Sequence, residues 1–403
     1  MSTAAVAPIR PPGAARRARV AAAALFFTNG ALFANLLPRY PEIKAALGLS
    51  NAAFGTAVAA YPLGALVAGL SAGLLIRRFR SSRVAVGGTL LSSAGYVAAG
   101  AAPVWVALAV ALFVAGAMDA ITDVAENSHG LRVQRLYGRS ILNSFHAVWS
   151  LGAVFGGIMG GTLATLGLST RAHMIVSAAV FSVTALLAYR WLLDGPEPQA
   201  PAPASVSTSR RAPALARYGF LLALVVIAAS GGLVEDAASS WAAIYLTGSL
   251  GATTFVAGLG FIALQGLQVV GRLLGDPMVD RFGRRRVART GGVIVLLGMG
   301  AALAWPSTPG TVAGFALAGL GIATWIPAAM HGADEAPGFA PGTGLTVVGW
   351  LVRIGLLASP PLVGAVADAF SLRAGLLVVP FAGVSAVLFA QVLSTRHPSS
   401  RPE

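Results

Sequence analysis

The chain is patterned as long apolar runs separated by short polar segments. A run of about 20 apolar residues crosses the ~30 Å hydrocarbon core of a bilayer as one α-helix. The sequence contains twelve such runs, so it predicts an all-α, polytopic membrane protein. The predicted spans are 20–38, 52–76, 84–102, 105–128, 141–165, 172–193, 218–246, 253–279, 287–305, 310–332, 342–367 and 373–394.

The composition excludes a soluble or a disordered chain. Of 403 residues, 56% are hydrophobic and only 10% are charged, whereas soluble domains carry about 25% charged residues and disordered segments have low hydrophobicity. The chain has no cysteine, which excludes disulfides, thiolate metal sites and a cysteine nucleophile. Because no zinc-ligand spacing or phosphate-binding glycine loop is present, we expect no metal and no cofactor.

The excess of basic residues predicts the topology. A net charge of +14 would suggest a nucleic-acid binder in a soluble domain, but here most arginines lie between the spans or at their ends, and only Arg272 and Arg353 are counted within spans. Placing both termini in the cytoplasm puts 22 basic residues inside and four outside, which is the asymmetry that orients membrane proteins. We therefore expect a multi-pass protein of the cytoplasmic membrane with no nucleic-acid partner. The four outer residues are Arg39, Lys44, Arg171 and Arg373.

One proline-rich segment divides the chain into two groups of six spans. Residues 194–217 hold five prolines, and such a segment favours an extended tether. We expect an N-terminal bundle at 20–193 and a C-terminal bundle at 218–394. The remaining residues form cytoplasmic tails at 1–19 and 395–403.

The two groups are related by an internal repeat. When the sequence is shifted by 203 residues, small residues and turn elements coincide without gaps. Parallel six-helix repeats are typical of secondary transporters, which bind their substrate at the repeat interface near the middle of the membrane. The coinciding pairs include Leu47 with Leu250, Gly55 with Gly258, Arg78 with Arg281, Phe79 with Phe282, Gly88 with Gly291 and Gly95 with Gly298.

The segment 276–286, Asp-Pro-Met-Val-Asp-Arg-Phe-Gly-Arg-Arg-Arg, resembles the signature loop of the major facilitator superfamily, G-x-x-x-D-R-x-G-R-R. Glycine allows a tight turn, and the acid can brace a neighbouring helix end. Asp276 replaces the first glycine of the signature, and the equivalent segment 73–80 lacks the aspartate and the second glycine. The expected gating residues are Asp276, Asp280, Arg281, Gly283, Arg284 and Arg285.

Three further segments, 123–130, 144–152 and 235–241, are similar to a bacterial branch of that superfamily related to fucose-type sugar permeases. The resemblance implies twelve helices in two pseudo-symmetric bundles that carry a small molecule across the membrane by alternating access. We expect a monomer whose partners are its solute and the bilayer. Relatives in this branch carry an apolar residue where Glu126 stands, so that carboxylate is expected to be particular to this protein.

A cluster of carboxylates on the fourth span predicts proton coupling. Asp119, Asp123 and Glu126 lie within about 60° of one another on a helix. Three such groups in a low dielectric cannot all ionise, so at least one should carry a proton. His146 on the next span could relay protons, or could be a structural, hydrogen-bonded histidine. In the alternative interpretation, Glu126 lies at the cytoplasmic mouth and Asp123 caps neighbouring groups.

Further polar and aromatic side chains at membrane depth are candidates for solute binding. Trp241 could stack on a sugar face or anchor the helix at the outer interface. Arg272 could pair with Asp276, whereas Arg353 has no carboxylate in its own span and needs a partner on another helix or an anionic ligand. The candidates are Asn29, Asn127, Asn143, Trp149, Glu235, Asp236, Trp241, Gln265, Gln268, Arg272, Trp350 and Arg353.

The sequence thus predicts a secondary transporter, not an enzyme, driven by an ion gradient because no nucleotide site is present. Two functions remain open, namely efflux of a drug or metabolite by proton antiport and uptake of a sugar-like solute by proton symport. The family resemblance favours uptake, and the segment 152–157 lacks the proline of the antiporter motif. A non-transporting receptor or an embedded enzyme is a third, weaker interpretation.

Overall fold

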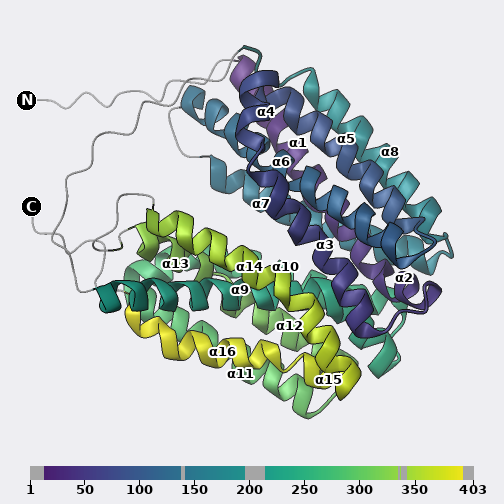
Figure 1. The fold of residues 1–403 in the computed structure, drawn as a ribbon. Helices are drawn as coiled ribbons and strands as arrows, with labels where there is room; N and C mark the ends of the chain where they lie inside the picture. The colour runs from purple at the N-terminus through teal and green to yellow at the C-terminus, as the bar shows by residue number, and fades with distance from the viewer. Residues whose placement is uncertain (1–12, 138–140, 196–213, 335, 337–342, 394–403) are drawn as a thin grey trace, which may run out of the picture.

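The computed structural model describes residues 13–137, 141–195, 214–334, 336 and 343–393, and every regular element in these ranges is helical. The helices form two groups (Figure 1), which we call the N half (13–195) and the C half (214–393). The elements of the N half are α1 (Gly13–Leu36), η1 (Leu37–Arg39), α2 (Tyr40–Ala46), α3 (Asn51–Gly69), α4 (Ala72–Phe79), α5 (Ser81–Gly100), α6 (Trp105–Tyr137), α7 (Leu142–Thr165) and α8 (Thr170–Tyr189). Those of the C half are α9 (Ala214–Leu250), α10 (Thr254–Phe282), α11 (Arg284–Ala304), α12 (Thr308–Ile322), α13 (Trp325–Asp334), α14 (Thr343–Ala369), α15 (Leu372–Gly375), α16 (Val378–Phe389) and η2 (Ala390–Val392).

Within the described residues, eleven helical segments are long and apolar enough to cross a membrane. The predicted span 84–102 is not among them, although it forms the 20-residue helix α5. This helix contains several serines and a threonine, which lower its mean hydropathy. Ser82, Thr89, Ser92 and Ser93 are buried. Since α5 packs on α6 and α8, these hydroxyl groups lie inside the N half.

The repeat seen in the sequence reappears in the helix boundaries. Asn51 and Thr254 begin α3 and α10, and Trp105 and Thr308 begin α6 and α12. The members of both pairs are 203 residues apart. The predicted linker and both tails fall largely outside the described residues, which leave out 1–12, 196–213 and 394–403.

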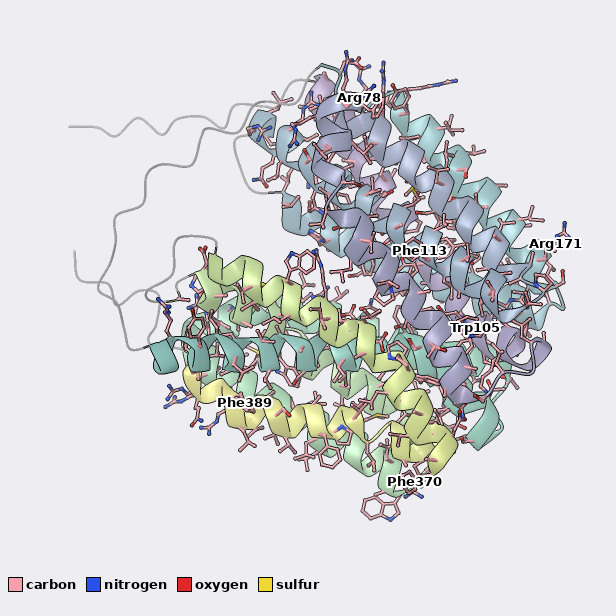
Figure 2. All side chains as sticks on the ribbon, viewed as in Figure 1. Arg78, Trp105, Phe113, Arg171, Phe370 and Phe389 are labelled. Atoms are coloured by element: carbon pink, nitrogen blue, oxygen red, sulfur yellow. The ribbon has the colours of Figure 1, made fainter. Side chains whose placement is uncertain are left out.

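The two halves differ in their contact at the two ends of the molecule. They meet at the end that holds α2 and α15 and diverge toward the end where α1 and α9 begin (Figure 1). We call the first the closed end and the second the basic end, because Arg78 lies there while Arg171 lies at the closed end (Figure 2). Between the halves, α14 packs on α3 and α10 packs on α7.

Glycines allow the helices of the N half to pack closely. A Cβ added at Gly152 or Gly156 would collide with the backbone carbonyl of Phe27 or Ala31, respectively. Both carbonyls belong to α1, so α1 and α7 are in near backbone contact. This is the small-residue packing that membrane helices use in place of a hydrophobic driving force.

Candidate functional site

A hydrogen-bonded cluster joins α1, α6 and α7 in the middle of the N half. The Asn29 side chain donates to the Asp119 carboxylate at 2.8 Å and accepts from the Trp149 indole at 2.7 Å. The Tyr61 hydroxyl, which hydrogen-bonds Tyr96 at 2.9 Å, also lies at the Asp119 carboxylate. The Asp119 carboxylate of α6 therefore contacts α1 and α3 directly, and reaches α7 through Asn29.

A second cluster lies one turn closer to the basic end. Asn127 donates to the Asp123 carboxylate at 3.0 Å, and its carbonyl oxygen lies 3.1 Å from His146 Nε2. Asp123 and His146 are both exposed. The structure thus brings together three residues that the sequence had placed on two different spans, while the Asn143 side chain lies outside the described residues.

Glu126 is separated from this exposed cluster. Its residue is 2% exposed, and its Oε1 atom has no hydrogen-bond partner within the described part of the chain. One turn further on, His129 is also buried and accepts a hydrogen bond from the Leu193 backbone N–H at 3.1 Å. Glu126 therefore faces protein, in contrast to Asp123.

The two adjacent acids of α9 reach different helices. Glu235 accepts from Gln265 at 3.5 Å and from Gln268 at 3.3 Å, and both glutamines belong to α10. Asp236 accepts from Ser359 of α14 at 2.7 Å and from Ser240 at 3.2 Å. The two adjacent side chains therefore point to different neighbouring helices.

Two arginines of the C half face the N half. Arg272 and Arg353 are exposed on α10 and α14. Asp123 lies within electrostatic reach of Arg353, and His146 lies within reach of Arg272. Trp350, one turn before Arg353, is half-buried. The side chain of Asp276, the other expected partner of Arg272, lies outside the described residues.

The closed end is held by an acid of one half that caps a helix of the other. Asp368 of α14 accepts hydrogen bonds from the backbone N–H groups of Asn51 and Ala52 at 2.9 and 2.8 Å, and from the Asn51 side chain at 2.9 Å. These groups form the first turn of α3, where backbone donors lack partners and the helix dipole favours an anion. A Cβ added at Gly55 would collide with the Pro360 carbonyl, so α3 and α14 are in backbone contact.

Aromatic side chains cover the inner side of this contact. Trp241 is fully buried and packs edge-on against Phe54 of the other half, with ring centroids 5.9 Å apart. Phe33 and Phe261 form a second pair across the halves at 6.3 Å. Trp241 is therefore part of the seal between the halves and does not anchor α9 at an outer interface.

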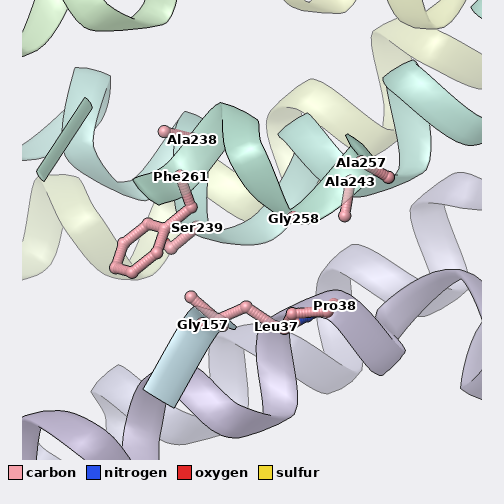
Figure 3. A pocket seen from close by; sticks show the side chains of 9 residues that line it. All are labelled: Leu37, Pro38, Gly157, Ala238, Ser239, Ala243, Ala257, Gly258 and Phe261. Carbon is pink, nitrogen blue, oxygen red and sulfur yellow. The ribbon is translucent and has the colours of Figure 1, made fainter. Parts of the chain in front are cut away.

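A small cavity remains beside this seal. Figure 3 shows it between Leu37, Pro38 and Gly157 of the N half and Ser239 and Phe261 of the C half. Its lining is mostly apolar, so it resembles a packing gap more than a polar binding site. Within the described residues, no group of three His, Asp or Glu side chains is arranged to hold a metal ion.

A buried ionic network near the closed end was missed by the sequence analysis. Arg39 is 1% exposed, donates to His173 Nδ1 at 3.0 Å and forms an ion pair with Glu42 at 2.7 Å. His173 Nε2 lies 2.8 Å from the Asn35 carbonyl oxygen, and Thr170 donates to Glu42 at 2.9 Å. The network ties η1 and α2 to α8. In the sequence, the one indication of this network is His173, a histidine within an apolar run.

The expected gating loop turns sharply at the basic end. Gly283 has φ 79° and ψ 151°, and Arg80, its counterpart 203 residues earlier, has φ 75° and ψ 147°. Arg281 lies over the Phe282 ring at 5.4 Å, and Arg285 donates to the Leu393 carbonyl at 3.0 Å. The loop therefore binds the residue that directly follows η2. Asp280 is exposed, and neither it nor Arg284 is free of interactions with other residues.

The family model and the related proteins that match this chain both indicate membrane proteins of one superfamily. Residues 22–266 and 227–403 match the family model described as Major Facilitator Superfamily. The chain is 31% identical over 372 residues to an uncharacterized transporter, y4wD, of Sinorhizobium fredii, covering 91% of this chain and 96% of that protein. It is 29% identical over 378 residues to the membrane protein MosC of Rhizobium meliloti, covering 94% and 90%.

Solved structures share the fold at low sequence identity. A variant of the nucleoside transporter NupG matches with a TM-score of 0.76 at 12% identity, covering 93% of this chain and 100% of that chain. A bacterial homologue of the lysosomal transporter Spinster, solved inward-facing and unoccupied, matches with 0.75 at 14%, covering 95% and 98%. A D-xylose-proton symporter matches with 0.70 at 18%, covering 94% and 98%.

Proposed function

Because the chain belongs to the Major Facilitator Superfamily and is a secondary transporter, we propose that it carries a small, sugar-like solute together with protons by alternating access. It is not an enzyme. The observation that carries the proposal is the difference between the two ends. Asp368 clasps α3 at the closed end, whereas Asp123, His146, Arg272 and Arg353 are exposed between the halves toward the basic end.

The proposal places the basic end in the cytoplasm. The arginines of the α4–α5 and α10–α11 turns lie there, and basic residues are retained on the cytoplasmic side of membranes. The structure would then be the inward-open state of a protein with twelve spans and cytoplasmic termini. Residues 20–193 and 218–394 would rock against each other as two six-helix units, joined by the linker 194–217. A monomer in the cytoplasmic membrane suffices for this cycle.

Asp119 is the proposed proton carrier. An ionised carboxylate at mid-depth is expensive once water is excluded, so loading a proton lets the site close around the solute. Asp119 binds Asn29, and Asn29 in turn binds Trp149. A change of charge at Asp119 would therefore alter contacts on α1 and α7, which approach the C half. Asp123 and Glu126 are the second and third candidates, and His146 is placed to relay protons to Asp123.

Sugar-like uptake is favoured over efflux. The segments 123–130, 144–152 and 235–241 resemble the fucose-type permease branch, and 152–157 lacks the proline typical of antiporters. The polar groups exposed or half-buried between the halves suit hydroxylated solutes, and one indole, Trp149, could stack on a sugar ring. Efflux by proton antiport is the second candidate function. It would be supported if addition of solute outside the vesicles drove protons out of the lumen.

The test uses proteoliposomes with a pH-sensitive dye inside. L-fucose, D-xylose and D-glucuronate are added outside in turn. We expect at least one solute to acidify the lumen, because solute and proton enter together. Asp119→Asn should abolish this acidification but spare exchange of labelled solute between the two sides, whereas Asp194→Asn, an exposed acid in a loop, should behave as wild type. Acidification by Asp119→Asn at the wild-type rate would refute the assignment and make Glu235 and Asp236 the leading candidates.

A further inference from the structure

Two guanidinium groups project from the C half at the depth where solute is bound in this fold class. Arg272 lies near the middle of α10 and Arg353 near the middle of α14, and both are exposed. The facing charged groups of the N half are Asp123, which is within electrostatic reach of Arg353, and His146, which is within reach of Arg272. The arginines therefore line the space between the halves.

The other acids of the central helices already have hydrogen-bond partners. Asp119 binds Asn29, Glu235 binds Gln265 and Gln268, and Asp236 binds Ser359. Among the described residues, in contrast, neither Arg272 nor Arg353 makes a hydrogen bond or a salt bridge. Arg272 and Arg353 thus differ from these acids in having no hydrogen-bond partner among the described residues.

Closing the basic end should make an arginine without a partner energetically unfavourable. In the open state, water solvates both arginines, but the occluded state of an alternating-access cycle removes that water. A charge that loses its water without gaining a partner is strongly destabilising. Asp123 can neutralise one arginine, and a neutral His146 adds no negative charge. Arg272 is left without an acid partner among the described residues, and the solute is the group that enters at this point of the cycle.

We propose that the transported solute carries a carboxylate or phosphate group, which Arg272 and Arg353 bind from the C half. The proposal rests on the proposed function and narrows its solute to a small, hydroxylated organic acid. Guanidinium groups bind planar anionic groups through paired, charge-assisted hydrogen bonds, which a lysine does not reproduce. Asn127, which is half-buried and lies 3.1 Å from His146 Nε2, is the proposed partner of a solute hydroxyl group.

The test measures the melting temperature of the purified full-length protein with four matched solutes. D-glucuronate and D-glucose 6-phosphate are the carboxylate and phosphate arms, D-glucose is the neutral control and D-glucosamine is the cationic control. Each solute is titrated against wild type, Arg272→Gln, Arg353→Gln and Arg353→Lys. The control variant is Arg171→Gln, which removes an exposed arginine at the closed end. Melting without solute shows that each variant is folded.

We expect one or both acids, but neither control solute, to raise the melting temperature of wild type and of Arg171→Gln. Either glutamine variant should weaken the apparent affinity at least about tenfold, and Arg353→Lys should keep only part of it. The proposal is overturned if glucose or glucosamine stabilises as well as the acids, if the acid effect survives both glutamine variants, or if no acid stabilises wild type. Proton-coupled entry of a neutral sugar would overturn it while leaving the proposed function intact.

Discussion

Removal of the Asp368 carboxylate should open the closed end. Asp368 accepts three hydrogen bonds from Asn51 and Ala52 across the two halves. The carboxylate is exposed, so water screens part of its effect. A helix N-cap contributes about 0.5–2 kcal/mol, and an anion at a helix N-terminus adds about 0.3–1 kcal/mol. Asp368→Ala should therefore destabilise the closed-end contact by about 2 kcal/mol, which shifts the ratio of the two states roughly 30-fold.

The absence of native cysteine allows two label pairs to measure this shift. Spin labels at Leu166→Cys and Phe370→Cys report the closed end, where both side chains are exposed. Labels at Phe79→Cys and Phe282→Cys report the basic end, where both rings are also exposed. In Asp368→Ala, the first pair should gain a population at longer distance and the second pair a population at shorter distance.

A matched control separates the clasp from a general effect of charge. Asp194→Ala removes an exposed acid whose backbone carbonyl, which the substitution keeps, accepts a hydrogen bond from Arg132. Both distance distributions should stay as in wild type. Asp368→Asn keeps one acceptor oxygen and should give an intermediate shift. Unchanged distributions in Asp368→Ala would refute the assignment of Asp368 as the clasp between the halves.

Two further predictions concern backbone geometry. Arg80 holds a positive φ that residues with a side chain rarely adopt, so Arg80→Gly should raise the melting temperature and Gly283→Ala should lower it. Each substitution should change the free energy of unfolding by about 1–2 kcal/mol. Melting temperatures equal to that of wild type would show that the turn carries no such backbone strain. Gly55→Val places carbon atoms where the Pro360 carbonyl lies, so this variant should be unable to close the contact between α3 and α14 and should lose solute exchange. Gly248→Val, whose added Cβ meets nothing within 4 Å, should retain solute exchange. Exchange at the wild-type rate in Gly55→Val would contradict the backbone contact.

The sequence predicts the fold well because the bilayer restricts what each segment can do. Apolar length identifies the spans, and the 203-residue shift identifies the repeat. The same shift even predicts the turn at Arg80, since its counterpart Gly283 lies in the signature loop. The span α5 shows the limit of the hydrophobic pattern. Its serines and threonine are tolerated because they are buried against α6 and α8, a tertiary fact that no window of the sequence contains.

The site could be predicted only where its parts lie on one helix. Asp119, Asp123 and Glu126 share a helix face, which periodicity reveals, but burial of Glu126 depends on neighbouring helices. The clasp joins Asp368 to Asn51 across 317 positions, and each residue alone resembles an ordinary polar residue at a helix end. Trp241 was a candidate for stacking or anchoring because an isolated tryptophan does not indicate which helix packs against it.

The central claim is that the space between the halves opens to the cytoplasm in this state. Gly349 lies one turn before Arg353, and an added Cβ there meets nothing within 4 Å. Gly248 is exposed at the closed end, and its added Cβ is equally free. Each position is replaced by cysteine in turn and treated with a membrane-impermeant thiol reagent in oriented vesicles. The account predicts that Gly349→Cys reacts only from the cytoplasmic side and Gly248→Cys only from the outer side. Reaction of Gly349→Cys from the outer side alone, or from neither side, would contradict it.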